Sequence, residues 1–367
     1  MDQSAVIQKL DRRKERLDSA SVSRLLFSRQ RDSSVPSRRT DGRRIALVIE
    51  GGAMRGVVSA GMVSALEQIG LRNCFDTVYG SSAGSISGAY FVAGQARYGT
   101  TIFYDNINNR RFINLWRLAL GRPIVSLEYL LDDVCANAKP LPADRTIFSD
   151  VPLRIVASSL REKKATILGD FASRTELVEA LRASARIPFF AGKPVAFRGD
   201  TFLDASIYQS IPYRAALAEG ATDLVILLTR QFGDLRDKPN WVDRNIIGPY
   251  LGAMDKDLMH HYLDRANEYR SEMDAIENLS KGNDGVHTLI VQTMPWNPKI
   301  SPLETSREKL LGGAMAGHEA VYSALGLPAP RLAEIIAPVM EAAPEGATRE
   351  SVHAEVAEVS PSPGREK

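Results

Sequence analysis

The sequence has few of the features that mark secreted, metal-binding or membrane-spanning proteins. Among its 367 residues are only two cysteines, Cys74 and Cys135, which lie far apart and lack metal-ligand spacing. We interpret them as thiols of a reducing compartment rather than as a disulfide framework. No apolar run reaches the roughly eighteen residues that a membrane-spanning helix needs, and the stretch MDQSAVIQKLDRRKERLDSA lacks the apolar segment of a secretory signal. These absences predict a cytoplasmic protein whose membrane contact is peripheral, at the inner membrane face.

An excess of charge of either sign is also missing. The 46 lysines and arginines nearly balance 44 aspartates and glutamates, which leaves a net charge of +2. Nothing in this balance points to a nucleic-acid partner. With 44% hydrophobic and 25% charged residues, the composition is that of a folded protein with a large core, arranged as one large α/β domain or as two smaller ones. The oligomeric state is left open.

Both ends of the chain are poor in core-forming patterns. Residues 1–42 are rich in arginine, serine and aspartate, and we expect a disordered leader with at most one short helix. An alternative is a basic arm that contacts anionic lipid. Residues 336–367 are low in bulky apolar side chains and are expected to form a disordered tail. The remaining residues, 43–335, are predicted to hold the functional domain.

Between these ends the pattern alternates strands with helices. RIALVIEGG and FDTVYGSSAGS are short β-rich runs that end in glycines, and each is followed by a segment with helical apolar spacing. LRIVASSL and KATILG predict a hairpin pair, and DLVILLT and HTLIVQT predict further strands. Such alternation is typical of a largely parallel sheet covered on both faces. Helix-rich insertions are expected at about 100–145 and 231–285, where they would set substrate choice.

The stretch YGSSAGS contains a GxSxG pattern made by Gly80, Ser82 and Gly84. In a nucleophile elbow the central serine occupies a sharp turn between a strand and a helix, and small neighbours leave its hydroxyl exposed. The strand before and the helix after Ser82 supply this context. The alternative is an ordinary polar turn, in which Ser81 and Ser82 have no chemical role.

A second glycine turn, GGAMRG at residues 51–56, also joins a predicted strand to a predicted helix. It lacks the GxGxxG spacing and the following lysine of nucleotide-binding loops, so a phosphate loop is disfavoured. A plain structural turn remains one interpretation. The other is an oxyanion hole, in which backbone amides face the oxygen that becomes negative when a nucleophile attacks an acyl carbonyl. A serine nucleophile on the neighbouring strand favours the second.

The third chemical feature is Asp204 in FLDASIYQSIP, which follows a predicted strand. A lone aspartate at such a position is most often a cap or turn former. Its place after ASARIPFF gives it another interpretation, because the order of these segments resembles that of a known enzyme family.

GGAMRG, GSSAG, ASARIPFF and DAS occur in this order over residues 43–300, and together they resemble the patatin-like phospholipase family. The resemblance implies an α/β fold, a three-layer α/β/α sandwich with a mostly parallel central sheet. It implies a serine lipid acyl hydrolase that needs no metal and no cofactor and cleaves carboxylic esters of phospholipids or other lipids through an acyl-enzyme. Ser82 would be the nucleophile and Asp204 the base of a dyad, with Gly80 and Gly84 in the elbow. The implied oxyanion loop contains Gly51, Gly52, Ala53, Arg55 and Gly56.

The sequence departs from the family pattern at two places. Ala53 replaces a glycine of the oxyanion loop, and Ala205 with Ser206 replaces the glycine pair that follows the base. If the turn after Asp204 needs a positive φ at position 205, alanine strains it. A weak or inactive binding module with a patatin-like fold is therefore an alternative function.

Two further alternatives concern the base and the acyl groove. A Ser-Asp-His esterase or thioesterase would take its base from His260, His261 or His287. Aromatic side chains would line an acyl groove or, as is more common, belong to the core; these are Trp116, Tyr129, Trp241 and Trp296.

Overall fold

A mixed sheet of eight strands forms the centre of the protein in a computed structural model that describes residues 19–280 and 285–329. The strands are β1 (Ile45–Ile49), β2 (Thr77–Ser81), β3 (Leu153–Ser159), β4 (Lys164–Leu168), β5 (Val195–Phe197), β6 (Asp200–Leu203), β7 (Asp223–Leu228) and β8 (His287–Gln292). Their order is β5-β6-β3-β2-β1-β7-β8, and β4 also pairs with β3. From β3 to β8 along this order every pair is parallel, whereas β4, β5 and β6 join antiparallel. The predicted mostly parallel sheet and the β3–β4 hairpin are confirmed.

Alternate residues of the central strands pack on opposite faces of the sheet. In β1, Ile45, Leu47 and Ile49 belong to one apolar cluster, and Ala46 and Val48 to another. Because both faces are buried, β1 is apolar throughout and β7 is apolar after Asp223. The fold class is therefore an α/β sandwich of three layers.

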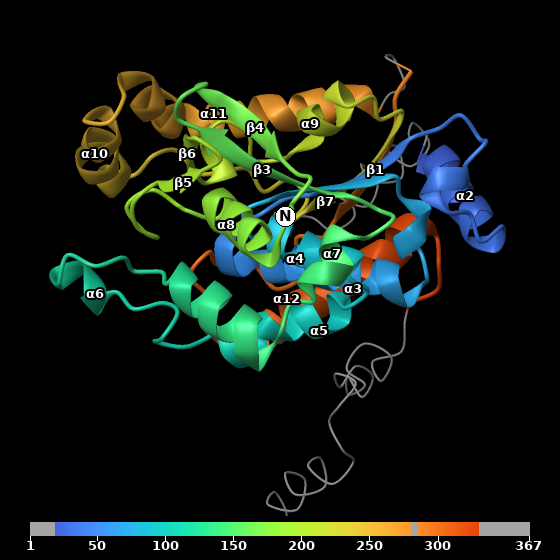
Figure 1. Cartoon of the computed structure of the whole chain (residues 1–367), viewed down its shortest axis with the longest axis horizontal. Helices are drawn as coiled ribbons and strands as arrows, with labels where there is room; N and C mark the ends of the chain where they lie inside the picture. The colour runs from blue at the N-terminus through green and yellow to red at the C-terminus, as the bar shows by residue number, and fades with distance from the viewer. Residues whose placement is uncertain (1–18, 281–284, 330–367) are drawn as a thin grey trace, which may run out of the picture. The chain divides into compact units, whose positions relative to one another are not determined.

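Helices cover both faces (Figure 1). Helices α3, α4, α5, α8 and α12 contribute to the first apolar cluster, and α9 and α11 contribute to the second. The α-helices are α2 (Ser19–Arg31), α3 (Val57–Gln68), α4 (Ala83–Val92), α5 (Ala96–Thr101), α6 (Trp116–Ala119), α7 (Ala143–Ile147), α8 (Arg174–Ser184), α9 (Tyr213–Ala218), α10 (Gly248–Gly252), α11 (Lys256–Leu279) and α12 (Arg307–Leu325). The shorter 3₁₀ and π elements are η1 (Pro36–Arg38), η2 (Ala53–Gly56), η3 (Arg72–Cys74), η4 (Ile102–Asn106), η5 (Tyr129–Ala138), η6 (Ala205–Ile207) and η7 (Asp243–Ile247).

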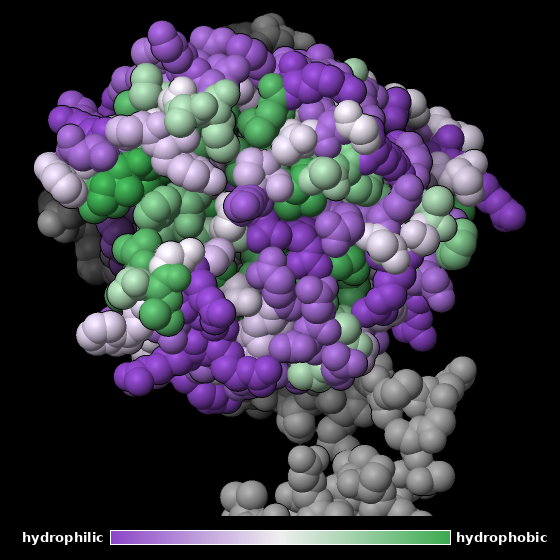
Figure 2. All heavy atoms as spheres, turned by 60° about the vertical axis from the view of Figure 1, so that its left-hand side comes forward, coloured by the Kyte–Doolittle hydropathy of each residue, from purple (hydrophilic) through white to green (hydrophobic). Residues whose placement is uncertain are grey.

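The two predicted insertions are indeed helical. The first contains η4, α6 and η5, and the second contains η7, α10 and α11. Helix α6 lies at the tip of an arm that projects at the left of Figure 1, and α10 projects on the same side. Figure 2, which turns this side forward, shows apolar patches between hydrophilic ones. Within the described ranges, no helix combines the length and apolar character that crossing a bilayer requires.

The expected disordered leader is wrong for residues 19–42. Helix α2 buries Val22 and Leu26 in the main apolar cluster. Arg29 on the same helix is only 2% exposed, and its guanidinium donates to Asp41 at 2.7 Å and to Asp76 at 2.8 Å. Composition suggested a solvated basic segment because it does not show that Arg29 pairs with Asp41 of the leader itself and with Asp76 farther along the chain. Residues 1–18 of the leader and the predicted tail at 336–367 lie outside the described residues.

Helices α3 and α12 cross at very short distance through glycines. A Cβ atom added to Gly317 would lie 2.1 Å from the carbonyl oxygen of Val58, and one added to Gly61 would lie 2.0 Å from that of Ala314. Backbone atoms cannot move aside as flexible side chains do, so only glycine fits at these two positions. This crossing fixes α3, the helix that follows the first glycine loop.

We expect Gly317→Ala to lower the free energy of unfolding by about 2 to 3 kcal/mol, because overpacking forces the two helices apart. Gly312→Ala in the same helix is the matched control: its added Cβ would meet Pro298 Cγ at 3.2 Å, and alanine gains helix propensity. Its stability should change by less than about 1 kcal/mol. Denaturant unfolding of both variants measures the difference, and equal stabilities would contradict the close packing.

Candidate active site

Ser82 lies at a sharp turn between β2 and α4. Its backbone has φ +52° and ψ −127°, a conformation that a residue with a side chain adopts only under strain. The Ser82 amide donates to Ser184 Oγ at 2.8 Å, and the Ser184 hydroxyl donates in turn to the carbonyl of Val156 at 2.6 Å. The turn is thus fixed from β3 and from the end of α8 as well as by its own strand.

Close backbone contacts explain the glycines on both sides of this turn. A Cβ on Gly80 would lie 2.4 Å from Ser85 Cα, and one on Gly84 would lie 2.4 Å from the carbonyl oxygen of Ile49. Small residues are therefore required where β2 turns into α4 and where α4 passes the end of β1. Gly80 and Gly84 thus occupy positions where any larger residue would collide with the backbone.

The two adjacent serines have different surroundings. The Ser81 hydroxyl donates to the carbonyl of Ser210 at 2.7 Å and accepts the Gly51 amide at 3.1 Å, so it joins three segments. Both serines line the polar cleft described below, but only Ser82 also lines the apolar cavity. The Ser81 hydroxyl is engaged by backbone groups on two sides, which leaves Ser82 as the candidate nucleophile.

Asp204 follows β6 directly, and its backbone is held from two sides. Its amide donates to the carbonyl of Arg186 at 2.9 Å, and its carbonyl accepts the Ser158 hydroxyl at 2.8 Å. The chain then enters the 3₁₀ turn η6, in which Ala205 has a negative φ. The expected strain at Ala205 is wrong, because this turn does not use the left-handed conformation that would need glycine.

The Asp204 carboxyl is 2% exposed and only half satisfied. Oδ1 accepts the Ser206 amide at 2.9 Å, whereas the buried Oδ2 has no hydrogen-bond partner among the described residues. Burial raises the pKa of Asp204 above its ordinary value, and the nearby Ser82 and Ser206 hydroxyls act in the opposite direction. The side chain therefore has an acceptor oxygen without a partner and a raised proton affinity beside the serine.

In the loop at residues 51–56, some backbone amides donate hydrogen bonds within the protein and others do not. The Gly51 amide donates to Ser81 Oγ, and the Arg55 amide donates to the Gly52 carbonyl at 3.1 Å. Gly56 does not line the cleft beside Ser82; a Cβ there would lie 2.7 Å from Ala83 Cβ. The amides of Gly52 and Ala53 donate to no described residue. Of the predicted oxyanion positions, Gly52 and Ala53 therefore have amides without an acceptor among the described residues, whereas the amides of Gly51 and Arg55 are engaged and Gly56 lies outside the cleft.

A buried carboxylate and a threonine hold this loop against β7. Glu50, 3% exposed, accepts the Thr229 amide at 2.6 Å and lies 2.9 Å from the Thr229 hydroxyl. The same hydroxyl lies 2.9 Å from the Gly51 carbonyl and accepts from Arg55 Nε at 3.3 Å. Nothing in the local sequence distinguishes Glu50, Thr229 and Ser184 from other polar residues, so these three were not predicted.

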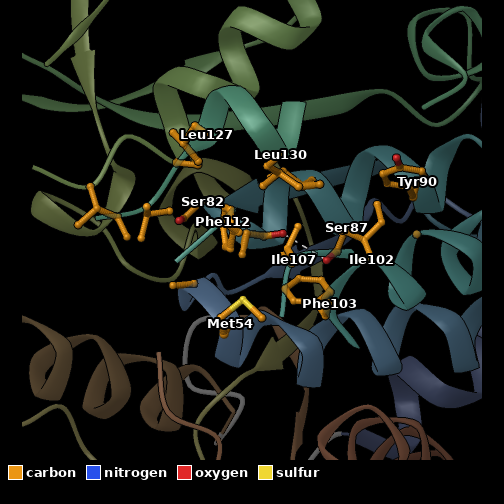
Figure 3. Close-up of a pocket in the computed structure, with 17 residues that line it drawn as sticks. Met54, Ser82, Ser87, Tyr90, Ile102, Phe103, Ile107, Phe112, Leu127 and Leu130 are labelled. Atoms are coloured by element: carbon orange, nitrogen blue, oxygen red, sulfur yellow. Dashed lines mark hydrogen bonds between the residues drawn. The ribbon is translucent and has the colours of Figure 1, made fainter. Parts of the chain in front are cut away.

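Two cavities meet at Ser82. A polar cleft of about 560 Å³ contains Asp204, the loop at residues 51–55 and several arginines. The second cavity is apolar, has a volume of about 40 Å³ and lies among α4, η4 and η5 (Figure 3). Its labelled walls include Met54, Phe103, Phe112 and Leu130. An ester at Ser82 would have an apolar side and a charged side.

The histidines considered as a third catalytic group lie elsewhere. No histidine of the described part of the chain lines either cavity. His287 begins β8 and pairs in register with the first residue of β7, so it lies at the amino-terminal ends of the parallel strands. Ser82 follows the carboxyl-terminal end of β2, at the opposite end of these strands. His261 Nδ1 lies 2.6 Å from Glu268 on the same helix, and His260 precedes it there.

The aromatic residues considered for an acyl groove are not in it. The three tryptophans are exposed at the surface, and none lines either cavity; they are Trp116, Trp241 and Trp296. Tyr129 is half-buried and donates to the Asn106 carbonyl at 3.0 Å. Both hypotheses for the tryptophans, core and acyl groove, are wrong.

Part of the sequence matches a known protein family. Residues 47–217 match the family described as Patatin-like phospholipase. The uncharacterized protein YjjU of Escherichia coli K12 is 28% identical over 202 residues, which are 55% of this chain and 56% of YjjU. Patatin-like phospholipase domain-containing protein 5 of Mus musculus is 27% identical over 37% of this chain and 31% of its own length. The chain thus spans about half or less of these relatives.

Solved structures with a similar arrangement are more distant in sequence. VipD from Legionella pneumophila is 11% identical, with a TM-score of 0.37 over 77% of this chain and 67% of its own. Human GIVD cytosolic phospholipase A2, solved in complex with methyl gamma-linolenyl fluorophosphonate, is also 11% identical, with a TM-score of 0.35 over 77% and 60%.

Replacing Asp204 or Asp200 by asparagine is expected to change the stability of the fold in opposite directions, because the two carboxyl groups have different environments. Asp204 has a raised pKa, so its ionised form destabilises the fold, and this cost grows as the pH rises from about 4 through its folded pKa. Burial also raises the pKa of Asp200, but hydrogen bonds from Ser159 and from the Thr201 and Arg161 amides outweigh it and leave that pKa lowered. We expect Asp204→Asn to stabilise the protein at pH 7 by on the order of 1 kcal/mol, and Asp200→Asn to destabilise it.

Thermal unfolding between pH 3 and pH 8 measures both variants. The advantage of Asp204→Asn should vanish below about pH 4, where the wild-type carboxyl is protonated in both states. Asp200→Asn should lose its disadvantage only at still lower pH. Destabilisation by Asp204→Asn at pH 7 would contradict the raised pKa.

Proposed function

We propose that this protein is a serine lipid acyl hydrolase in which Ser82 attacks the carboxylic ester of a lipid, and the match of residues 47–217 to the patatin-like phospholipase family supports this proposal. The observation that carries the proposal is the buried Asp204 Oδ2, which lacks a hydrogen-bond partner among the described residues and lies beside a strained serine elbow. A purely structural aspartate would have both oxygens satisfied. A base awaiting a proton keeps one acceptor free.

In the first half of the reaction the serine hydroxyl becomes a nucleophile. Asp204 takes the proton as Ser82 Oγ bonds to the ester carbonyl carbon. The carbonyl oxygen becomes negative, and the amides of Gly52 and Ala53 are free to donate to it. Collapse of this tetrahedral intermediate breaks the ester C–O bond, and the proton held by Asp204 passes to the departing alcohol. An acyl-enzyme on Ser82 remains.

The second half repeats these steps with water. Asp204, again ionised, accepts a proton from water as the water oxygen attacks the acyl carbon. The second tetrahedral intermediate uses the same two amides and then releases the fatty acid while Ser82 Oγ regains its proton. The apolar cavity suits the acyl chain, but about 40 Å³ holds only a few water-sized groups, so a long chain requires η4 and η5 to separate.

The alternatives have less support. A Ser-Asp-His triad would need a histidine near Asp204, and no described histidine lines the cleft. An inactive binding module was suggested by the Ala205 turn, but that residue has an unstrained negative φ. A dyad needs neither a metal ion nor a cofactor.

The first test is covalent labelling by a fluorophosphonate together with turnover of a short-chain p-nitrophenyl ester. We expect Ser82→Ala to abolish labelling and to lower turnover by about a thousandfold or more, because no other hydroxyl occupies the elbow. Ser81→Ala is the matched control and should still be labelled, since its hydroxyl is engaged with Ser210. Labelling that persists in Ser82→Ala would refute the nucleophile.

His287→Ala separates the two choices of base in the same assay. Retained hydrolysis is expected, because His287 lies at the amino-terminal ends of the parallel strands, whereas Ser82 lies at their carboxyl-terminal ends. Near-complete loss in a folded variant would instead favour the triad.

We further propose that the enzyme acts at an anionic bilayer, with the α6 arm as its contact. The arm, residues 106–127, contains four arginines and no acidic residue. At its tip Leu115, Trp116 and Leu120 are 63%, 79% and 73% exposed. Exposed apolar side chains among basic ones are typical of interfacial segments. At its base Val125 lines both cavities, so a lipid that meets the arm is near Ser82.

The double variant Trp116→Ala/Leu120→Ala should bind anionic vesicles at least about tenfold more weakly, because each buried side chain contributes about 1.5 to 3 kcal/mol. Phe148→Ala is the control: Phe148 is 81% exposed but lies outside the arm. Sedimentation with phosphatidylserine-containing vesicles measures binding. Turnover of a soluble ester should stay unchanged in both variants, and equal vesicle binding by the wild type and the double variant would exclude the arm.

A further inference from the structure

The polar cleft beside Ser82 gathers positive charge from segments far apart in the sequence. Its walls include Arg55 from η2, Arg230 just after β7, Arg236 from the β7–η7 connection and Arg265 from α11. Lys238 also lines it. The last three of these arginines lie beyond residue 217, outside the segment that matches the family. Family membership therefore does not account for them.

Four carboxylates line the same cleft, and two of them are already engaged. Asp243 accepts Arg265 Nη2 and the Tyr262 hydroxyl, both at 2.8 Å. Glu50 is engaged by Thr229, as described above. Asp237 is exposed at the rim, and Asp204 is the proposed base.

The arginines are less completely paired than these carboxylates. Arg230 pairs with Asp234 only at 3.4 Å. Within the described residues, neither Arg55 nor Arg236 forms an ion pair. Arg236 Nη1 donates to the Ser210 hydroxyl at 3.1 Å. Arg55 and Arg236 thus bring positive charge to the cleft that no ion pair with a described residue neutralises.

Several donors of the cluster are buried without an acceptor. Nε of Arg230 and both Nε and Nη1 of Arg265 have no hydrogen-bond partner among the described residues. Unsatisfied buried donors are costly, so these donors require an acceptor from water or from a ligand. These donors and the unpaired Arg236 surround one cavity.

The cluster also repels itself. Burial lowers the pKa of Arg236 to about 10, and the charges of Arg265, Arg230 and Arg55 contribute in the same direction. A bound anion would offset both effects, whereas a cationic group would increase them. A phosphate offers the acceptor oxygens that guanidinium groups bind in pairs.

We propose that Arg236, with Arg230 and Arg265, binds the phosphate of a lipid headgroup while Ser82 attacks an acyl ester of the same molecule. The substrate class is thus the acyl esters of glycerol phosphate whose phosphate bears no cationic substituent. This proposal rests on the proposed hydrolysis at Ser82. It assigns the charged side of the ester to the polar cleft and the acyl side to the apolar cavity.

Arg236 could also act on the reaction without touching the substrate, because its charge lowers the pKa of Asp204. An arginine that acted only through Asp204 would affect all esters equally and would shift their pH profiles. An arginine that binds phosphate changes the preference between headgroups.

The experiment compares two soluble substrates with the same short acyl chain, a monoacylglycerol and its 3-phosphate. We expect the wild type to have the higher kcat/KM for the phosphate, and Arg236→Gln to reduce the ratio of the two kcat/KM values by about tenfold or more, chiefly through KM. Arg236→Lys should recover part of the ratio, since it keeps charge without the planar fork. Arg244→Gln, which removes an exposed arginine of η7 outside the cleft, should leave the ratio unchanged.

Thermal unfolding of each variant verifies that it is folded. Equal losses on both substrates, with a shifted pH profile, would overturn headgroup binding in favour of an effect on Asp204. A wild type without preference between the two substrates would overturn it as well.

A binding measurement separates this proposal from the proposed hydrolysis. Calorimetric titration of Ser82→Ala with sn-glycerol 3-phosphate should show binding that Arg236→Gln weakens about tenfold or more, even if no ester is hydrolysed. Inorganic phosphate should bind more weakly, because it lacks the glycerol contacts. Equal binding of the two would indicate a site for free phosphate, and absence of binding by both would indicate none; either result contradicts the headgroup site.

Discussion

The strained backbone of Ser82 is the constraint on which the site depends. Its φ of +52° costs on the order of 1 to 3 kcal/mol, and it persists because the surroundings determine it from several sides. The strand order places β1 and β3 on either side of β2. The glycine loop after β1 therefore meets the turn from one side, and Ser184, anchored on Val156 of β3, holds its amide from the other. The same order of strands brings Asp204, which follows β6, across β3 toward the serine.

Local patterns predicted the parts of this site that are contiguous in sequence. A β-rich run that ends in glycines and precedes helical spacing was sufficient to locate β1, β2 and the elbow at Ser82. The supporting residues were not predictable in this way, since Ser184 lies 102 positions from Ser82, and Thr229 lies 179 positions from Glu50. The place of helix α2 in the core was not predicted for a related reason: one of the two carboxylates that pair with its buried Arg29 belongs to Asp76, 47 positions away. Pairing over such separations is a property of the topology.

Of the two departures from the family pattern, Ala53 is strained in the structure and Ala205 is not. Ala205, where the sequence suggested possible strain, enters a 3₁₀ turn with negative φ. Ala53, the milder substitution, has φ +52° and bears the strain that glycine would avoid, at a cost of roughly 1 to 2 kcal/mol. That cost is carried by an amide with no acceptor among the described residues. An oxyanion loop would retain such strain, because a relaxed backbone at Ala53 would point the amide away from the developing anion.

Charge in the cleft links binding to the strength of the base. Burial raises the pKa of Asp204, and the positive charge of Arg236 acts against that rise. A phosphate that pairs with Arg236 would cancel part of this opposition, so the carboxylate would hold a proton more strongly in the substrate complex than in the empty cleft. A stronger base takes the Ser82 proton more readily. Substrates with the anionic headgroup would thereby add a smaller gain in kcat to their lower KM, whereas an uncharged ester would leave Asp204 as it is in the free enzyme.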